Sequence, residues 1–193
     1  MPHPLILLSS LIALISPIIY ARAIFFFFSK PHRTTRLVLL TITLLSTFAL
    51  FAQHDTVAIW LAGVSALQAI FIFILSLKYG MGGYSITDGL CLVVAIIGIL
   101  FWQITQNPTV GLYFAILADF TGMVPSLIKT YKMPHTEIYM FFLLDVFAGF
   151  FNLLAVKQWT ASEVSFPLYI MLINLAMVVL VLRQDVTKKM KMS

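Results

Sequence analysis

The sequence predicts an all-α integral membrane protein of seven transmembrane helices, arranged as two parallel three-helix bundles joined by a linker helix. Of its 193 residues, 61% are hydrophobic and only 10% are charged, whereas a soluble domain averages about 25% charged residues. The apolar residues gather in seven runs of roughly the length that crosses a bilayer. The first and fifth runs share a pattern, which indicates an internal repeat.

Short breaks with turn chemistry separate the apolar runs, such as the loop from Gly80 to Gly83 and the Asn107-Pro108 pair. The second run is the weakest because it is short and rich in threonine. We expect the first run to be retained, since no basic segment precedes it as in a signal peptide. The expected spans are Leu5–Phe28, Arg36–Phe51, Val57–Leu77, Thr87–Ile104, Thr109–Tyr131, Ile138–Val156 and Phe166–Leu182.

The repeat divides the chain into two similar units. Pro17 is followed by Arg22 and a Pro-His turn, and Pro125 is followed by Lys129 and a second Pro-His turn. Two units of three spans run parallel only if the segment between them also crosses the membrane. We therefore expect three-helix bundles at 1–79 and 107–184, an inner loop and linker helix at 80–106, and a basic tail at 185–193.

The basic residues fall almost entirely on one side of this topology. With loops that alternate between sides, 11 of the 12 lysines and arginines share a side, and Lys157 lies on the other. Cytoplasmic loops carry an excess of basic residues, so we expect an external N-terminus and a cytoplasmic C-terminus. The net charge of +5 then reflects orientation and contact of the tail with membrane lipids, and no nucleic-acid partner is expected.

Asp119 and Asp145 are acidic residues well inside apolar spans. A charge at the bilayer centre costs about 2.5–3.5 kcal/mol on insertion scales, and intramembrane acids are usually functional. We predict a proton-coupling role for both, because a carboxyl group can switch between a neutral and a charged form. Asp119 shares one helical stripe with Gly122 and Ser126, which is typical of a face turned into a bundle. The alternative for Asp145 is a structural ion pair with Arg22.

Three amide side chains are the predicted substrate-binding groups. Gln68 and Asn174 lie at similar depths in the third and seventh spans, which correspond in the two units. Asn152 shares a stripe with Asp145 on the sixth span. An amide offers both hydrogen-bond donors and an acceptor to a polar solute. The alternative role for these residues is to join helices by hydrogen bonds within the bundle.

Pro17 and Pro125 are predicted hinges. Each removes one backbone hydrogen bond from its helix and pushes on the carbonyl four residues back, which kinks the helix. A static bend is the simpler interpretation of one such proline. Two at matching positions of a repeat favour a hinge, because transporters use broken helices in this way.

The sequence favours no catalytic, metal or cofactor site. Cys91 is the only cysteine, which excludes an intramolecular disulfide and a cysteine metal cluster. His32 and His135 have no metal-binding spacing and are expected to belong to turns. Asp88 is expected to cap the fourth helix. The last span has no lysine for a retinal Schiff base, and no nucleophile and base lie in plausible register, so we expect no enzyme.

Several motifs resemble those of a known superfamily. Lys30 to Thr35 reads Lys-Pro-His-Arg-Thr-Thr, Lys78 to Gly83 reads Lys-Tyr-Gly-Met-Gly-Gly, and Asp119 to Pro125 matches Asp-x-x-Gly-x-x-Pro. Ala118 to Gly122 is similar to a Leu-Asp-Phe-Thr-Gly stretch of the lysosomal cystine exporters. With its 3+1+3 arrangement, the chain resembles the PQ-loop superfamily, which includes the SWEET sugar transporters and bacterial nicotinamide riboside transporters. Most of its length is similar to a group of bacterial PQ-loop-like membrane proteins.

The resemblance implies alternating access between two bundles, a bacterial cytoplasmic membrane, and a small polar solute such as a sugar, an amino acid, or a nucleoside- or vitamin-like molecule. Protons are the candidate coupling ion. The chain lacks the glutamine that follows the family's proline, since Ile18 and Ser126 stand there. Sugar specificity is therefore not implied. A non-transporting scaffold, assembly factor or lipid-binding protein is the alternative, and the direction of transport and any homo-oligomer stay open.

Overall fold

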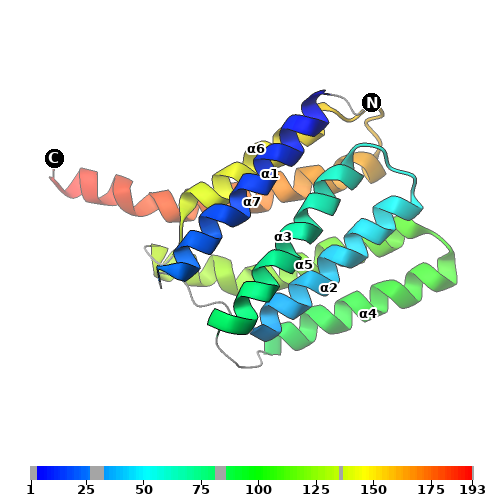
Figure 1. Cartoon of the computed structure of the whole chain (residues 1–193), viewed down its shortest axis with the longest axis horizontal. Coiled ribbons are helices and arrows are strands. Elements are labelled where there is room, and N and C mark those ends of the chain that lie inside the picture. Colours follow the sequence, from blue (N-terminus) through cyan, green and yellow to red (C-terminus); the bar gives the residue numbers. More distant parts are fainter. Residues whose placement is uncertain (1–3, 27–32, 81–85, 135–136, 193) are drawn as a thin grey trace.

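A computed structural model shows an all-helical chain (Figure 1). The structure describes residues 4–26, 33–80, 86–134 and 137–192, except the side chains of Ala23, Pro125 and residues 184–192. The predicted fold class, a helical membrane protein with seven helices, is confirmed. The helices are α1 (Pro4–Phe25), α2 (Arg33–Ala52), α3 (Ala58–Tyr79), α4 (Ile86–Thr105), α5 (Pro108–Lys132), α6 (Tyr139–Leu154) and α7 (Ala161–Met192).

In the described part of the chain, six helices are long and apolar enough to cross a membrane, and α6 is a shorter apolar helix. The prediction that the second span is the weakest is wrong, because α2 has 20 residues and α6 has 16. The threonines of α2 fit a membrane helix because their hydroxyls bond to carbonyls one turn back. Thr41 donates to Leu37, and Thr47 donates to Thr43.

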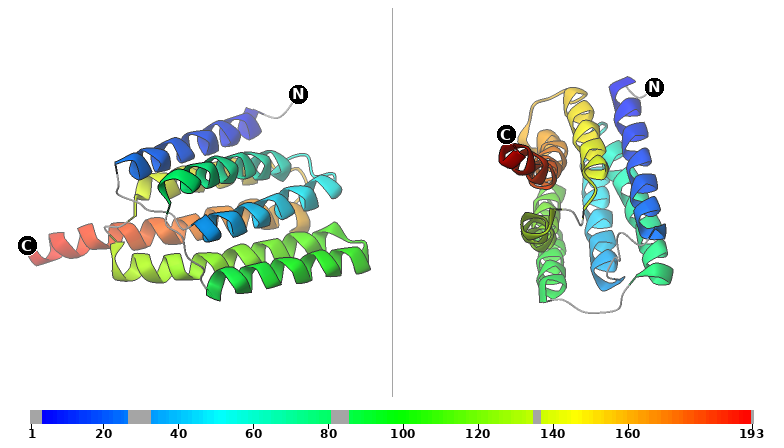
Figure 2. Two further views of the ribbon diagram at one scale, coloured as in Figure 1. Left: turned by 60° about the horizontal axis from the view of Figure 1, so that its bottom comes forward. Right: turned by 90° about the vertical axis from the view of Figure 1, so that its left-hand side faces the viewer.

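The packing of the helices follows a twofold pattern (Figure 2). Helix α3 packs between α1 and α2, and α7 packs between α5 and α6, while the outer helices of each triplet do not meet within the described residues. Between the triplets, α1 packs on α6, α2 packs on α5, and α3 meets α7. Exchanging the triplets α1–α3 and α5–α7 preserves these contacts, whereas a further contact of α3 with α6 has no counterpart between α7 and α2 in the described residues. Helix α4 lies outside both triplets, against α5 and α2.

The bundle has two chemically different ends. At the basic end, α1, α3 and α5 finish and α2, α4 and α6 begin, and Arg36, Lys78 and Lys129 lie there. At the opposite, aromatic end lie the tryptophans Trp60 and Trp159. The two chain termini lie at opposite ends of the molecule (Figure 1).

Helix α7 is longer than predicted at both ends. It begins at Ala161 instead of Phe166, with Glu163 in its first turn, where a negative charge interacts favourably with the helix dipole. Its backbone stays helical to Met192 and extends past the bundle, through the predicted tail. Arginine and lysine are good helix formers, and no glycine or proline follows Pro167 to stop the helix.

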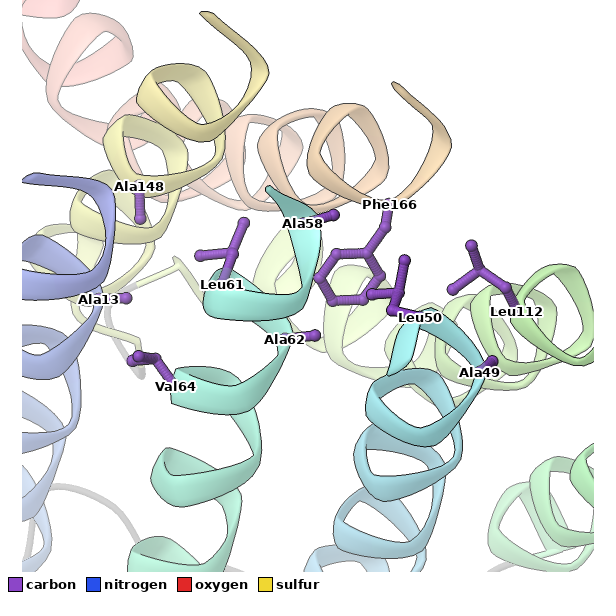
Figure 3. Packing of buried hydrophobic residues seen from close by; sticks show 10 residues of the cluster. All are labelled: Ala13, Ala49, Leu50, Ala58, Leu61, Ala62, Val64, Leu112, Ala148 and Phe166. Carbon is purple, nitrogen blue, oxygen red and sulfur yellow. The ribbon is translucent and has the colours of Figure 1, made fainter. Parts of the chain in front are cut away.

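The largest apolar cluster closes the half of the bundle nearer the aromatic end (Figure 3). It joins six helices and consists of Ala13, Ala49, Leu50, Ala58, Leu61, Ala62, Val64, Leu112, Ala148 and Phe166. Half of these residues are alanines, and small residues let helix backbones approach closely where lipid provides no hydrophobic driving force. Helix α4 approaches α5 closely at Gly98, where an added Cβ atom would lie 2.3 Å from the Cβ of Phe114.

Candidate functional site

A cavity of about 580 Å³ lies between the two triplets and is lined by residues of all seven helices. Toward the basic end its wall includes Arg36, Asp88 and Lys129, which lie in the terminal turns of their helices. Toward the aromatic end its wall includes Leu61 and Ala148, which also belong to the apolar cluster of Figure 3. The cavity therefore reaches the basic end of the bundle and ends against packed side chains in the other direction.

Asp119, one of the two predicted proton-coupling residues, lies on the cavity wall near the middle of α5. The hydroxyl group of Tyr169 on α7 donates a hydrogen bond to its Oδ2 atom. This contact joins two helices of the same triplet. Sequence reasoning missed Tyr169, and its only signal was a phenol group inside an apolar span.

Asp145 on α6 also lines the cavity, and its surroundings differ. The side chains of Ser16 on α1 and Gln68 on α3 lie near its carboxyl group, and the hydroxyl of Ser16 donates to the carbonyl of Phe141 at 3.4 Å. An acid of the second triplet thus lies beside two polar groups of the first. The alternative pairing with Arg22 is not seen, since Arg22 is exposed and the one salt bridge among the described residues joins Lys129 and Glu137 at 2.9 Å.

The predicted substrate-binding amides separate into two groups. Gln68 and Asn174 both line the cavity, from α3 and α7. Asn174 is only 8% exposed, and its Nδ2 atom donates to the carbonyl of Ile170 at 2.8 Å. Asn152 lies apart from the cavity. It is fully buried near the aromatic end, where its Nδ2 atom donates to the carbonyl of Val57 at 3.1 Å.

Polar residues of three helices form the wall near the basic end. The guanidinium group of Arg36 donates to the hydroxyl of Tyr20 and lies over its ring, 5.0 Å from the centroid. The hydroxyl of Thr35 donates to Asp88 at 3.2 Å, and Asp88 is 4% exposed. The expectation that Asp88 simply caps α4 is therefore incomplete, because the packing of α2 against α4 buries its side chain beside a donor.

The two predicted hinges lie on matching helices. Pro17 is buried inside α1, which continues as a helix through it. Pro125 falls inside α5, and its side chain lies outside the described residues. His32 and His135 also lie outside them. Within the described ranges, no three histidine, cysteine, aspartate or glutamate side chains come close enough to hold a metal ion.

The cavity thus combines the carboxyl groups of Asp119 and Asp145, two amides and an apolar floor, with Asp88 and Glu137 on its wall toward the basic end. Such an arrangement fits a small polar molecule, because binding pockets are typically concave and mostly apolar, with a few convergent polar groups. No family model, no curated protein and no solved structure matches the chain.

Proposed function

We propose that the protein is a membrane transporter that moves a small polar solute by alternating access between its two helix triplets. The observation that carries this proposal is the cavity, which is lined by all seven helices, reaches the basic end and ends in the apolar cluster. Transporters built from repeats bind their substrates in this place, near mid-depth at the interface of the repeats. The twofold pattern of helix contacts supports the same interpretation.

Hydrogen bonds between the triplets support a state closed at the aromatic end. The hydroxyl of Ser9 on α1 donates to the carbonyl of Ala148 on α6 at 2.7 Å. Asn152 joins α6 to the residue before α3. In alternating access these contacts break when the aromatic end opens and the basic end closes.

Two side-chain hydrogen bonds at the basic end remain within single triplets, whereas the longer contact from Ser16 on α1 to the carbonyl of Phe141 on α6, at 3.4 Å, crosses between them. Arg33 donates from α2 to the carbonyl of Ser76 on α3 at 3.2 Å. Arg183 donates from α7 to the carbonyl of Tyr131 on α5 at 2.8 Å. These contacts let each triplet move as a unit. In our proposal Pro17 and Pro125 provide the bending points.

The orientation and the coupling ion complete the proposal. The basic end faces the cytoplasm, because basic residues concentrate on that side of membrane proteins, and the structure then represents an inward-open state. Asp119 takes up and releases the coupling proton, since it lies on the cavity wall near the middle of α5. The resemblance to the PQ-loop superfamily supports this mechanism.

Flux measurements in reconstituted vesicles test the proposal. Purified protein is placed in liposomes with an imposed pH gradient, and uptake of radiolabelled sugars, amino acids, nucleosides and vitamins is recorded. We expect one class to accumulate in a gradient-dependent way, and Asp119→Asn to abolish the dependence. Glu163→Gln is the matched control, because it also replaces a carboxyl group by an amide and lies in the first turn of α7. It is expected to leave the flux intact. Gradient-dependent flux that survives in Asp119→Asn refutes the proton role, and absence of flux for the whole panel refutes transport.

A non-transporting assembly scaffold is the second candidate, and one observation favours it. The backbone of α7 extends as a helix beyond the bundle to Met192. A projecting helix with basic residues suits attachment to a partner or to anionic lipid. Truncation after Arg183 separates the candidates, because a scaffold loses its function while a transporter keeps its flux.

A further inference from the structure

Several hydrogen-bond donors along the cavity wall are used by the protein itself. The Nδ2 atom of Asn174 faces the carbonyl of Ile170, which can only accept a hydrogen bond, so the side-chain orientation is fixed. The hydroxyl of Tyr169 donates to Asp119. The amide of Gln68 lies near the carboxyl group of Asp145. The hydroxyl groups of two wall serines can serve in either role.

The acceptors on the same wall remain open. The Oδ1 atom of Asn174 has no hydrogen-bond partner among the described residues, although the side chain is more than nine-tenths buried and lines the cavity. A carboxylate offers about four acceptor positions, and the described hydrogen bonds of Asp119 occupy one. Asn174 Oδ1 and the free positions of the carboxylates can accept hydrogen bonds from a bound molecule, so this wall suits a ligand that brings hydrogen-bond donors.

The charged residues of the cavity wall indicate the charge of that ligand. The two basic residues on the wall are both engaged near the basic end, Lys129 with Glu137 and Arg36 with Tyr20. Along α5, Lys129 lies ten residues after Asp119, a rise of about 15 Å. In the described structure neither Asp119 nor Asp145 forms a salt bridge. The middle of the cavity is therefore acidic without a cationic partner.

Two aromatic side chains complete the environment. Phe141 and Phe142 line the cavity one helical turn before Asp145. The face of an aromatic ring attracts a cation within about 6 Å, and Arg36 already lies in this way over the neighbouring ring of Tyr20. The ring centroids of Tyr20 and Phe141 are 5.0 Å apart, so an aromatic wall continues from the basic end into the cavity.

We propose that the cavity binds an organic cation that carries N–H donors, a primary ammonium or guanidinium group on a small apolar body. The ammonium or guanidinium group lies between Asp119 and Asp145 and donates to Asn174 Oδ1, while the apolar body lies against the phenylalanines. This inference deepens the proposed transport function by naming its substrate class. Neutral sugars and carboxylates are disfavoured, since sugars bring no positive charge to the two acids and carboxylates bring a negative one.

Four probes that share one aromatic ring and differ in their head group test the inference by binding alone. Benzylamine, benzyl alcohol, benzoate and benzyltrimethylammonium are titrated into detergent-purified protein by calorimetry, with melting temperature as a second readout. We expect benzylamine to bind at least about tenfold more tightly than the other three, a difference of about 1.4 kcal/mol. Benzyltrimethylammonium, which has the charge without an N–H group, isolates the contribution of the donors. Equal affinity for benzylamine and benzyl alcohol, stronger binding of benzoate, or no binding of any probe overturns the inference.

Single-residue variants test where in the cavity benzylamine binds. Asp119→Asn, Asp145→Asn and Asn174→Ala are each expected to weaken benzylamine binding about tenfold, and Glu163→Gln to leave it unchanged. Asn174→Ala keeps both acids, so it carries the test if an aspartate variant does not fold. Benzylamine binding that is unaffected by all three changes overturns the assignment of the site.

The binding assay also separates this inference from the transport proposal. Amine binding in a protein without flux in vesicles retains the cation site and removes transport. Gradient-dependent flux of a neutral solute without amine binding retains transport and removes the cation site.

Discussion

The hydroxyl group of Tyr169 on α7 donates a hydrogen bond to the carboxyl group of Asp119 on α5. The contact fixes the acid on the cavity wall and joins α5 to α7, which pack against each other within the second triplet. A carboxyl group that must exchange a proton or a cation needs a defined position, and a phenol on a neighbouring helix provides it. Tyr169 is therefore a positioning residue in our proposal.

Tyr169→Phe is expected to reduce gradient-dependent flux by roughly ten- to a hundredfold, because a hydrogen bond to a charged group contributes about 1.5–3 kcal/mol. Tyr113→Phe on the same α5 helix is the control, since Tyr113 is 43% exposed and does not line the cavity. Uptake into proteoliposomes measures both. Equal flux in the two variants contradicts the positioning role.

Adjacent serines on α1 provide a matched pair for stability. Ser9 donates to Ala148 across the seam between the triplets, whereas the hydroxyl of Ser10 is buried without a hydrogen-bond partner among the described residues. Ser9→Ala is expected to lower the free energy of unfolding by about 0.5–1.5 kcal/mol. Ser10→Ala removes an unsatisfied polar group and is expected to leave the melting temperature unchanged or raise it. Thermal unfolding in detergent distinguishes the two, and a larger loss for Ser10→Ala contradicts the contact.

Gly98→Ala is expected to destabilise the packing of α4 against α5 by about 1–3 kcal/mol. The added methyl group meets the Cβ atom of Phe114 at 2.3 Å, so shortening that side chain to alanine does not rescue the variant. Gly63→Ala is the control, because an added Cβ there meets nothing within 4 Å. Melting temperatures that fall equally in both variants contradict this account of the α4–α5 contact.

The two asparagines separate structure from binding. Asn152→Ala removes the hydrogen bond to Val57 and is expected to lower the free energy of unfolding by about 1–3 kcal/mol without changing the affinity for benzylamine. Asn174→Ala is expected to weaken that affinity with a smaller effect on unfolding. Calorimetry and thermal unfolding of the same preparations measure both quantities. Weaker benzylamine binding by Asn152→Ala, with unchanged binding by Asn174→Ala, assigns Asn152 to the binding site.

The sequence predicted the helices well because apolar length alone identifies a membrane span. The sequence identified Asp119 as a candidate site residue for a related reason, because inserting an acidic side chain within such a span is costly. Its partner Tyr169 was missed because the two residues are separated by 50 positions, and only the packing of α7 on α5 brings them together. A tyrosine near the end of a span is also typical of the membrane–water interface.

The surroundings of Asn152 and Asp88 also differ from the sequence-based expectation, because they too depend on how the helices pack. Asn152 and Asp145 share a helical stripe in the sequence, but α6 passes from the cavity into the tightly packed aromatic end, so only Asp145 meets the cavity. Asp88 follows a loop and reads as a cap, whereas the contact between α2 and α4 buries it. Periodicity gives the face of a helix, and the depth at which that face meets a neighbour is a property of the assembled bundle.

The short α6 helix has a consequence for the surrounding lipid. Its 16 residues extend about 24 Å at a rise of about 1.5 Å per residue, less than the roughly 30 Å hydrocarbon thickness of a typical bilayer. Phe147 and Phe150 on its outer face are exposed, so acyl chains next to α6 must compress or be shorter than their neighbours. We therefore expect lipids with shorter acyl chains to match α6, the helix that carries Asp145, better than lipids with longer chains.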